Sequence, residues 1–150
     1  MEHYEVKNNN LLINTNPALL DIALIYKFLS QESYWAKGIP LATVQTSINN
    51  SLCFGVYDGD KQIGFARVIT DRAVFAYLAD VFIVEKHRGK GLSKWLVQSI
   101  HAHPDLQGLR RWMLATHDAH GLYKQFGWAE VSDEQNKRMM QKHNPDVYRL

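Results

Sequence analysis

The stretch VFAYLADVFIVEKHRGKGLSKWLVQSI, from Val74 to Ile100, changes character along its length and decides how the chain is interpreted. Val74 to Val84 is almost wholly apolar and rich in β-branched and aromatic residues, which predicts a strand buried on both faces. A polar loop with two glycines follows, and from Leu92 onward apolar residues recur at the spacing of one helical face. The stretch therefore predicts a strand, a glycine loop and a helix.

A glycine loop that leads into a helix is suited to bind an anion. The first helical N–H groups have no intrahelical acceptors and point out of the turn. Gly89 and Gly91 can adopt positive φ and allow a phosphate to approach the backbone. Arg88 and Lys90 add charge near the positive end of the helix dipole. We therefore expect a diphosphate to bind here.

Three phosphate-binding motifs can be compared with this loop. A dinucleotide fingerprint needs a glycine where this chain has Lys94, and a P-loop needs a longer glycine spacing followed by Lys-Ser or Lys-Thr. The run Lys86-His87-Arg88-Gly89-Lys90-Gly91 instead resembles the acyl-CoA loop of the GNAT superfamily of N-acetyltransferases, written Gln/Arg-x-x-Gly-x-Gly/Ala. Lys86 departs from that pattern, whereas Ser93 keeps a small residue where many members have one.

A second segment resembles the same family. Arg111 to Ala115 is predicted to be a strand, and THDAHGLYKQFGW follows it. The matching GNAT segment reads approximately Asn-x-x-Ala-x-x-Leu-Tyr-x-x-x-Gly-Phe, in which Thr116 replaces the asparagine and Trp128 the final aromatic residue. The residues that match are Ala119, Leu122, Tyr123 and Gly127. Two linked motifs in the right order are more specific than a glycine loop alone.

Length and composition limit the other function classes. With 150 residues and 46% hydrophobic content, residues 1–150 should form one domain around one core. A net charge of +2 gives no support for nucleic-acid binding. The single cysteine, Cys53, fits a reducing compartment. The polar N-terminus has no signal-peptide core, and no apolar run approaches the ~18 residues of a membrane span. We expect a cytoplasmic protein that does not enter membranes.

Periodicity and turn residues predict the remaining elements. Asn16 followed by Pro17 is typical of a helix start, and Asp58-Gly59 between two β-rich runs favours a hairpin. The further predicted helices are Pro17–Ser30, a helix from Ile39-Pro40 to Asn49, and a short one at Tyr123. The further predicted strands are Leu11–Ile13, Leu52–Tyr57, Gln62–Ile69, Trp128–Val131 and Val147–Leu150. The strand at Arg111 should lie parallel to the Val74 strand through a right-handed crossover.

This order agrees with the GNAT fold along nearly the whole chain. The resemblance implies an α/β (α+β) fold with a mixed, mostly antiparallel central sheet of about six to seven strands and about four flanking helices. In that family the two parallel strands splay apart, and the pantetheine arm of the cofactor lies between them. The resemblance implies Phe82, Ile83 and Val84 along the arm, and the amides of Arg88, Gly89, Lys90, Gly91, Leu92 and Ser93 around the diphosphate.

The same resemblance suggests which groups carry the chemistry. Tyr123 matches a tyrosine that protonates the CoA sulfur in many relatives, although it could simply pack against the sheet. The backbone N–H of Ile83 or Val84 is the oxyanion donor expected in this family. Asp80 is the candidate base, acting through a water, because a lone carboxylate in an apolar strand is costly to bury without a role or a partner. A structural bond to a basic residue is its alternative, and Glu85 is the other candidate base.

Histidines and aromatic residues give weaker signals. We interpret His117 and His120 as surface residues, and because no His/Cys spacing matches a zinc template we expect no metal site. Tyr34 and Trp35, with Glu32 nearby, lie in the region that borders the acceptor site in this fold. They suit a small cationic amine or, equally, core packing.

We therefore expect an acetyl-CoA-dependent N-acetyltransferase that moves the acetyl group directly to a primary amine of a small molecule or peptide. A non-catalytic acyl-CoA-binding or sensing module is the alternative, and Tyr123 with an acidic group in reach favours the enzyme. An NAD-binding domain is disfavoured by Lys94 and by the antiparallel strands. A homodimer is compatible with the family.

Overall fold

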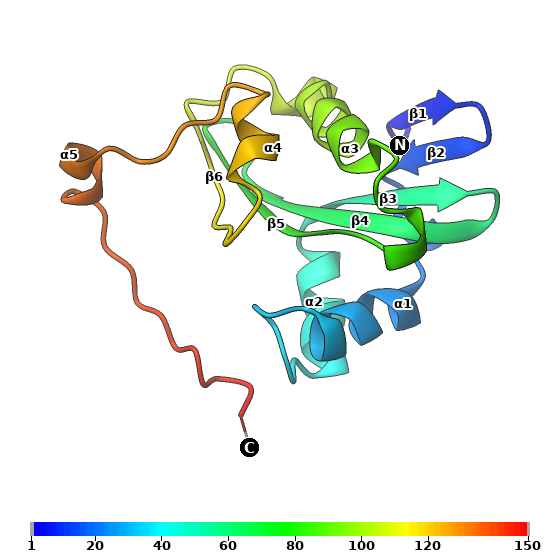
Figure 1. Ribbon diagram of the computed structural model, residues 1–150, viewed down its shortest axis with the longest axis horizontal. Coiled ribbons are helices and arrows are strands. Elements are labelled where there is room, and N and C mark those ends of the chain that lie inside the picture. Colours follow the sequence, from blue (N-terminus) through cyan, green and yellow to red (C-terminus); the bar gives the residue numbers. More distant parts are fainter. Residues whose placement is uncertain (1, 150) are drawn as a thin grey trace.

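A six-stranded sheet runs through the centre of the computed structural model, which describes residues 2–149 (Figure 1). The strands follow one another across the sheet in chain order, and every neighbouring pair is antiparallel except β5 and β6. They are β1 (Glu5–Asn8), β2 (Leu11–Asn14), β3 (Leu52–Asp58), β4 (Lys61–Thr70), β5 (Phe75–Ile83) and β6 (Arg111–Met113). The predicted mixed, mostly antiparallel sheet is confirmed, and so is the parallel pairing of its last two strands.

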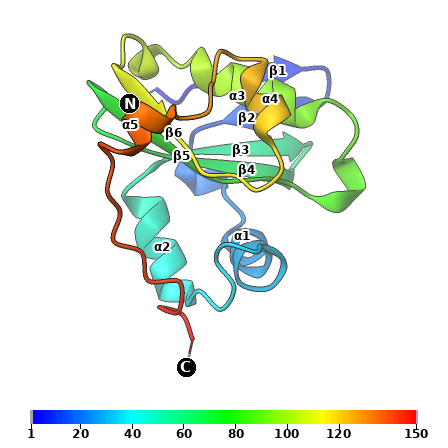
Figure 2. The same cartoon turned by 60° about the vertical axis from the view of Figure 1, so that its left-hand side comes forward.

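Helices cover both faces of this sheet. α3 (Leu92–His101) and α4 (His120–Lys124) lie on one face, and α1 (Ile22–Lys27) and α2 (Leu41–Asn49) lie on the other (Figures 1 and 2). Neighbouring strand residues point to opposite faces, so Phe54 packs in the core under α3 while Cys53 packs in the core under α2. A short α5 (Asp133–Asn136) follows near the end of the chain. Within the described residues no helix is long and apolar enough to cross a bilayer.

The helix predicted over Pro17–Ser30 is divided into three parts. A 3-10 turn, Pro17–Leu19, comes first, then α1, and then a π-helical turn, Phe28–Glu32. Leu20 is extended, and the Asp21 carboxylate accepts the Leu24 N–H at 3.1 Å, which starts the helix a second time. A capping residue inside the predicted helix therefore interrupts it.

Two predicted strands are wrong. Residues 128–131 have no strand partner, because Trp128 is held in a loop by its ring, which packs on Trp112 and donates from Nε1 to His101 Nε2 at 2.9 Å. Residues 147–149 form a turn in which the Val147 N–H donates to the Asn144 carbonyl at 3.3 Å. Leu150 lies outside the described residues. In their place the sheet has β1, a short polar edge strand that hydrophobic periodicity did not predict.

A half-buried histidine, His101, and a buried one, His103, make the stability of the fold depend on pH. His101 accepts the Trp128 indole N–H, and Nδ1 of His103 accepts the Asp105 N–H at 3.0 Å. Burial lowers the pKa of both imidazoles. In the unfolded chain both imidazoles have the ordinary histidine pKa of ~6.5. Below that pH the unfolded chain therefore binds protons more readily than the folded protein does. The free energy of unfolding should be greatest above that pH and should decrease as the pH falls through it.

Thermal unfolding followed by circular dichroism between about pH 8 and about pH 5 measures this dependence. The Tm of the parent protein should decrease on acidification. A His101→Gln/His103→Gln double variant should start from a lower Tm and lose less of it, because the groups that take up protons on unfolding are gone. An equal decrease in both proteins would contradict the assignment to these histidines.

Candidate functional site

Strands β5 and β6 separate after a short pairing. Residues 75–77 of β5 pair with residues 111–113 of β6, and the register ends there. β5 continues to Ile83, and within residues 2–149 no strand pairs with that side of it, while the chain after β6 turns into the loop that leads to α4. The edge of β5 from Leu78 onward is therefore open toward this loop. This is the separation that the family resemblance implied.

Backbone geometry distinguishes the two candidate oxyanion donors at this open edge. The Val84 N–H donates to the Ile63 carbonyl at 2.8 Å, so it is not available as an oxyanion donor and that alternative is wrong. Successive residues of an antiparallel ladder alternate between facing the partner and facing away, so the N–H and C=O of Ile83 point away from β4, into the gap. The Ile83 carbonyl accepts from Arg88 Nε at 2.9 Å, which leaves the Ile83 N–H. The Phe82 ring lies in the core under α2.

A β-bulge in β5 lies beside the gap. Phe65 pairs with Phe82 and Arg67 with Ala79, so β5 carries one residue more than β4 between these pairs. Asp80 lies in the bulge with φ of 56°, in the left-handed region that residues with a Cβ rarely adopt. The bulge turns the Asp80 side chain out of the regular alternation of the strand.

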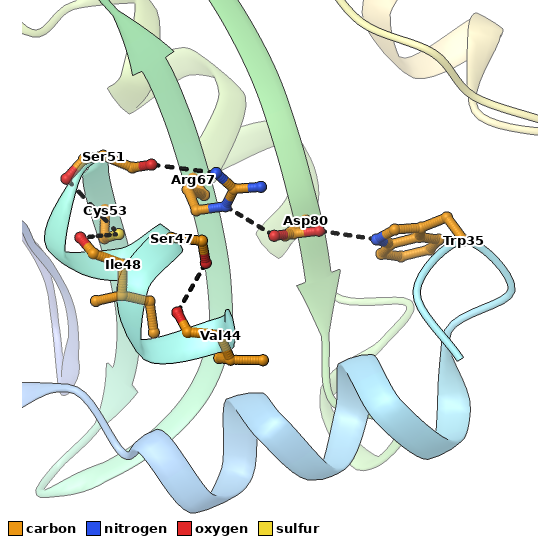
Figure 3. Close-up of polar contacts among 8 residues, drawn as sticks. All are labelled: Trp35, Val44, Ser47, Ile48, Ser51, Cys53, Arg67 and Asp80. Atoms are coloured by element: carbon orange, nitrogen blue, oxygen red, sulfur yellow. Dashed lines mark hydrogen bonds and ion pairs between the residues drawn. The ribbon is translucent and has the colours of Figure 1, made fainter. Parts of the chain in front are cut away.

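Both carboxylate oxygens of Asp80 have partners. Oδ1 accepts from Trp35 Nε1 at 2.8 Å, and Oδ2 accepts from Arg67 Nε at 2.8 Å (Figure 3). Arg67 in turn donates to Ser51 Oγ at 3.1 Å. The two charged side chains are only 16% and 10% exposed, so the ion pair is largely desolvated. The alternative role for Asp80, a structural bond to a basic residue, is therefore present. Asp80 also lines a cavity beside β5.

The glycine loop has the geometry predicted for an anion site. Gly89 and Gly91 have φ of 79° and 78°, and an added Cβ would meet no atom within 4 Å at either position. Among the described residues, no hydrogen bond uses the N–H groups of residues 89–94. The loop therefore presents unpaired backbone donors and open space at the positive end of the α3 dipole. Those features fit a diphosphate.

A cavity of about 650 Å³ lies in the gap between β5 and the loop before α4. Its lining includes Tyr34, Trp35, Tyr77, Asp80, His117, Tyr123 and His143. Tyr123 projects from α4 and is 7% exposed, and burial raises its pKa to about 12, with a smaller contribution from Tyr34. The phenol therefore keeps its proton at neutral pH. Tyr123 also borders a smaller cavity of about 300 Å³, together with His120 and Trp128.

The structure shows which of the other candidate residues line the large cavity. His117, predicted to be a surface residue, is exposed and also borders the large cavity, whereas Glu32 and Glu85 are exposed and do not line it. Sequence reasoning missed Arg67 and His143. No local signal marks either residue, because Arg67 reaches the site through strand register and His143 through the path of the C-terminal segment.

Comparisons with known proteins agree with this geometry. Residues 49–130 match the Acetyltransferase (GNAT) domain. A Gibberella zeae protein assigned to the acetyltransferases is 34% identical over 134 residues, which cover 75% of each chain. A Xanthomonas campestris pv. campestris crystal structure assigned to the GNAT acetyltransferases is 49% identical with a TM-score of 0.90, and the match covers 96% of this chain and 100% of that one.

A more distant structure shares the fold. It is a GNAT family acetyltransferase from Elizabethkingia anophelis solved with acetyl-CoA bound, 13% identical with a TM-score of 0.62, matched over 84% of this chain and 80% of its own. The domain match spans more than half of the present chain and includes the open edge of β5, the glycine loop and Tyr123. The chain belongs to the GNAT family of acetyltransferases, whose members use acetyl-CoA.

Proposed function

We propose that the protein transfers an acetyl group from acetyl-CoA directly to a primary amine of a small molecule or peptide. The observation that carries the proposal is the open edge of β5, which lies between a loop of unpaired N–H donors and the buried, protonated Tyr123. Acetyl-CoA supplies the activated thioester. A strand edge suits an extended amide-containing chain such as pantetheine, and a helix N-terminus suits its diphosphate.

The residues that would hold the cofactor follow from these positions. Ile83 offers its free N–H to the thioester end of the cofactor. Val84, whose N–H is already bonded, contributes only its side chain, and Phe82 contributes packing beneath the pantetheine arm. The diphosphate would be bound by the backbone of the loop, with Arg88 and Lys90 adding positive charge. The loop residues in this role are Arg88, Gly89, Lys90, Gly91, Leu92 and Ser93.

Direct transfer is favoured because the single cysteine is poorly suited to carry the acetyl group. Cys53 is the single cysteine, it is buried, and burial raises the pKa of its thiol to about 12. Its thiolate is therefore scarce at neutral pH. The acceptor amine attacks the thioester carbonyl, a C–N bond forms, and the C–S bond breaks. The Ile83 N–H stabilises the oxyanion, and Tyr123 donates its proton to the departing thiolate.

The acceptor amine must lose a proton during this reaction. We propose that Asp80 receives it through a water, because Asp80 lines the cavity. Each of its oxygens accepts one hydrogen bond and still has a lone pair that can accept another. Solvent exchange then restores the proton of Tyr123. This assignment gives Asp80 a catalytic role in addition to its structural one.

A screen of amines for CoA release tests the activity itself. The parent protein should release CoA with at least one amine and produce the N-acetyl product in equal amount, detected by mass spectrometry. Tight acetyl-CoA binding without release for any amine would favour the alternative, a non-catalytic acyl-CoA-binding or sensing module. The protonated phenol at the gap is the observation that favours the enzyme.

Replacing Gly91 with valine should abolish acetyl-CoA binding. A residue with a Cβ in the left-handed region costs about 1–2 kcal/mol, so the loop would leave its conformation and its amides would no longer converge. Gly59→Val is the matched control, since Gly59 has φ of 62° and equally open surroundings but lies in the β3–β4 hairpin. Calorimetry should show tight acetyl-CoA binding and weak NAD binding for the parent protein and for the control. Unchanged affinity in folded Gly91→Val would refute the site.

Tyr123→Phe should slow the chemical step by ~10²-fold or more, the usual scale of positioned acid catalysis. The ring and its packing remain, so acetyl-CoA affinity should stay the same. A lower rate with an intact dissociation constant marks a lost transition-state interaction. Single-turnover measurements are required because product release can mask chemistry. If the variant reacts at the parent rate, Tyr123 is packing only, and His120 is the next proton donor to replace.

A further inference from the structure

Two adjacent residues of the loop before α2 connect β5 to the loop that follows β6. Trp35 donates from Nε1 to Asp80 in the bulge of β5 at 2.8 Å (Figure 3). Tyr34 accepts, at its hydroxyl oxygen, the N–H of His117 in the loop after β6, at 3.1 Å. The two aromatic rings meet edge to face with centroids 4.9 Å apart. Tyr34 and Trp35 therefore form a bridge, the Tyr34–Trp35 bridge, between the two sides of the gap.

The loop that carries this bridge is itself fixed. Ser33 is 1% exposed, and its hydroxyl donates to the Leu29 carbonyl at 2.7 Å while it accepts the Ala36 N–H at 3.0 Å. The Gly38 N–H donates to the Ser30 carbonyl at 3.0 Å. These bonds tie the loop to the π-helical turn on both sides of the bridge. The backbone that carries the two rings is therefore fixed by hydrogen bonds to the π-helical turn.

Each end of the bridge is also anchored. On the β5 side, Arg67 holds the second oxygen of Asp80, which fixes the direction in which the first oxygen faces Trp35. On the other side, the His117 ring lies 4.2 Å from the Tyr34 ring, centroid to centroid. His117 belongs to the loop that leads into α4 and thus to Tyr123. A displacement of the bridge would move the proton donor relative to the edge of β5.

The exposed fractions of the two rings separate this arrangement from ordinary core packing. Tyr34 is 51% exposed and Trp35 is 42% exposed, although each makes a specific hydrogen bond. Both rings line the large cavity. Their free surfaces therefore border the space that an acceptor would occupy, at the end where Asp80 and Tyr123 meet the same cavity.

We propose that the Tyr34–Trp35 bridge sets the width of the gap between β5 and the β6–α4 loop, so that both residues are positioning residues for acetyl transfer. The inference rests on the proposed function for its kinetic consequence. A fixed gap holds the edge of β5 and the Tyr123 hydroxyl at the separation that the reaction needs, and small misplacements of reacting groups cost up to ~10²-fold in rate.

Tyr34→Phe and Trp35→Phe each keep a ring and remove one hydrogen bond. Each variant should lower kcat/KM for the amine by about tenfold, whereas acetyl-CoA affinity at the glycine loop should stay within about twofold of the parent value. Loss of either hydrogen bond already releases the bridge. The kcat/KM of the double variant should therefore be only slightly below that of the more impaired single variant. Tyr26→Phe is the control, because Tyr26 packs against the core under α2 outside the cavity. Parent kinetics in both single variants, or losses that multiply, would overturn the bridge.

A readout without turnover keeps this test separate from the proposed function. In Trp35→Phe, hydrogen exchange at the amides of residues 114–119 should become faster, although the substituted side chain contacts the opposite side of the gap. Unchanged exchange there would overturn the bridge whether or not an amine is found. Failure of the parent protein to release CoA with any amine would instead count against the proposed function alone.

Discussion

The pairing of β5 with β6 stops after residues 75–77, and the candidate site depends on that early end. Unpaired backbone groups inside a protein are costly and are normally satisfied by a neighbouring strand, a side chain or a ligand. At Ile83 the carbonyl is satisfied by Arg88, while the N–H faces the gap. The protein thus keeps the far part of β5 unpaired beside β6, which is where an extended ligand can complete the hydrogen bonding.

The bulge at Asp80 adds a second constraint beside the first. A carboxylate in an apolar strand needs partners, and Asp80 obtains an ion pair from Arg67 on β4 and an indole N–H from Trp35. Those partners also support the left-handed backbone, whose cost is about 1–2 kcal/mol for a residue with a Cβ. The same contacts that make the charge tolerable therefore connect β5 to its neighbouring strand and to the loop before α2.

Local signals in the sequence predicted much of this fold, and nonlocal ones explain the errors. Positive φ at Gly89 and Gly91 follows from residue type and from the helix that comes next, and both positions were predicted. The engagement of the Val84 N–H depends on the register of β5 against β4, which no local pattern encodes. Trp128 has an apolar neighbourhood typical of a strand, yet its hydrogen bond to His101 keeps it in a loop.

The two ends of the site are built from different materials, and this explains why the sequence identifies one and not the other. The end that fits the cofactor consists of backbone groups, which need only glycines, a strand and a helix in series and therefore leave a short, readable motif. The end where we propose that the acceptor binds is assembled from side chains of separate segments, such as Trp35, His117 and His143. No spacing relates these residues, so each can change while the cofactor motif persists. Under the proposed function, the choice of amine is therefore encoded in tertiary contacts rather than in the motif that reveals the family.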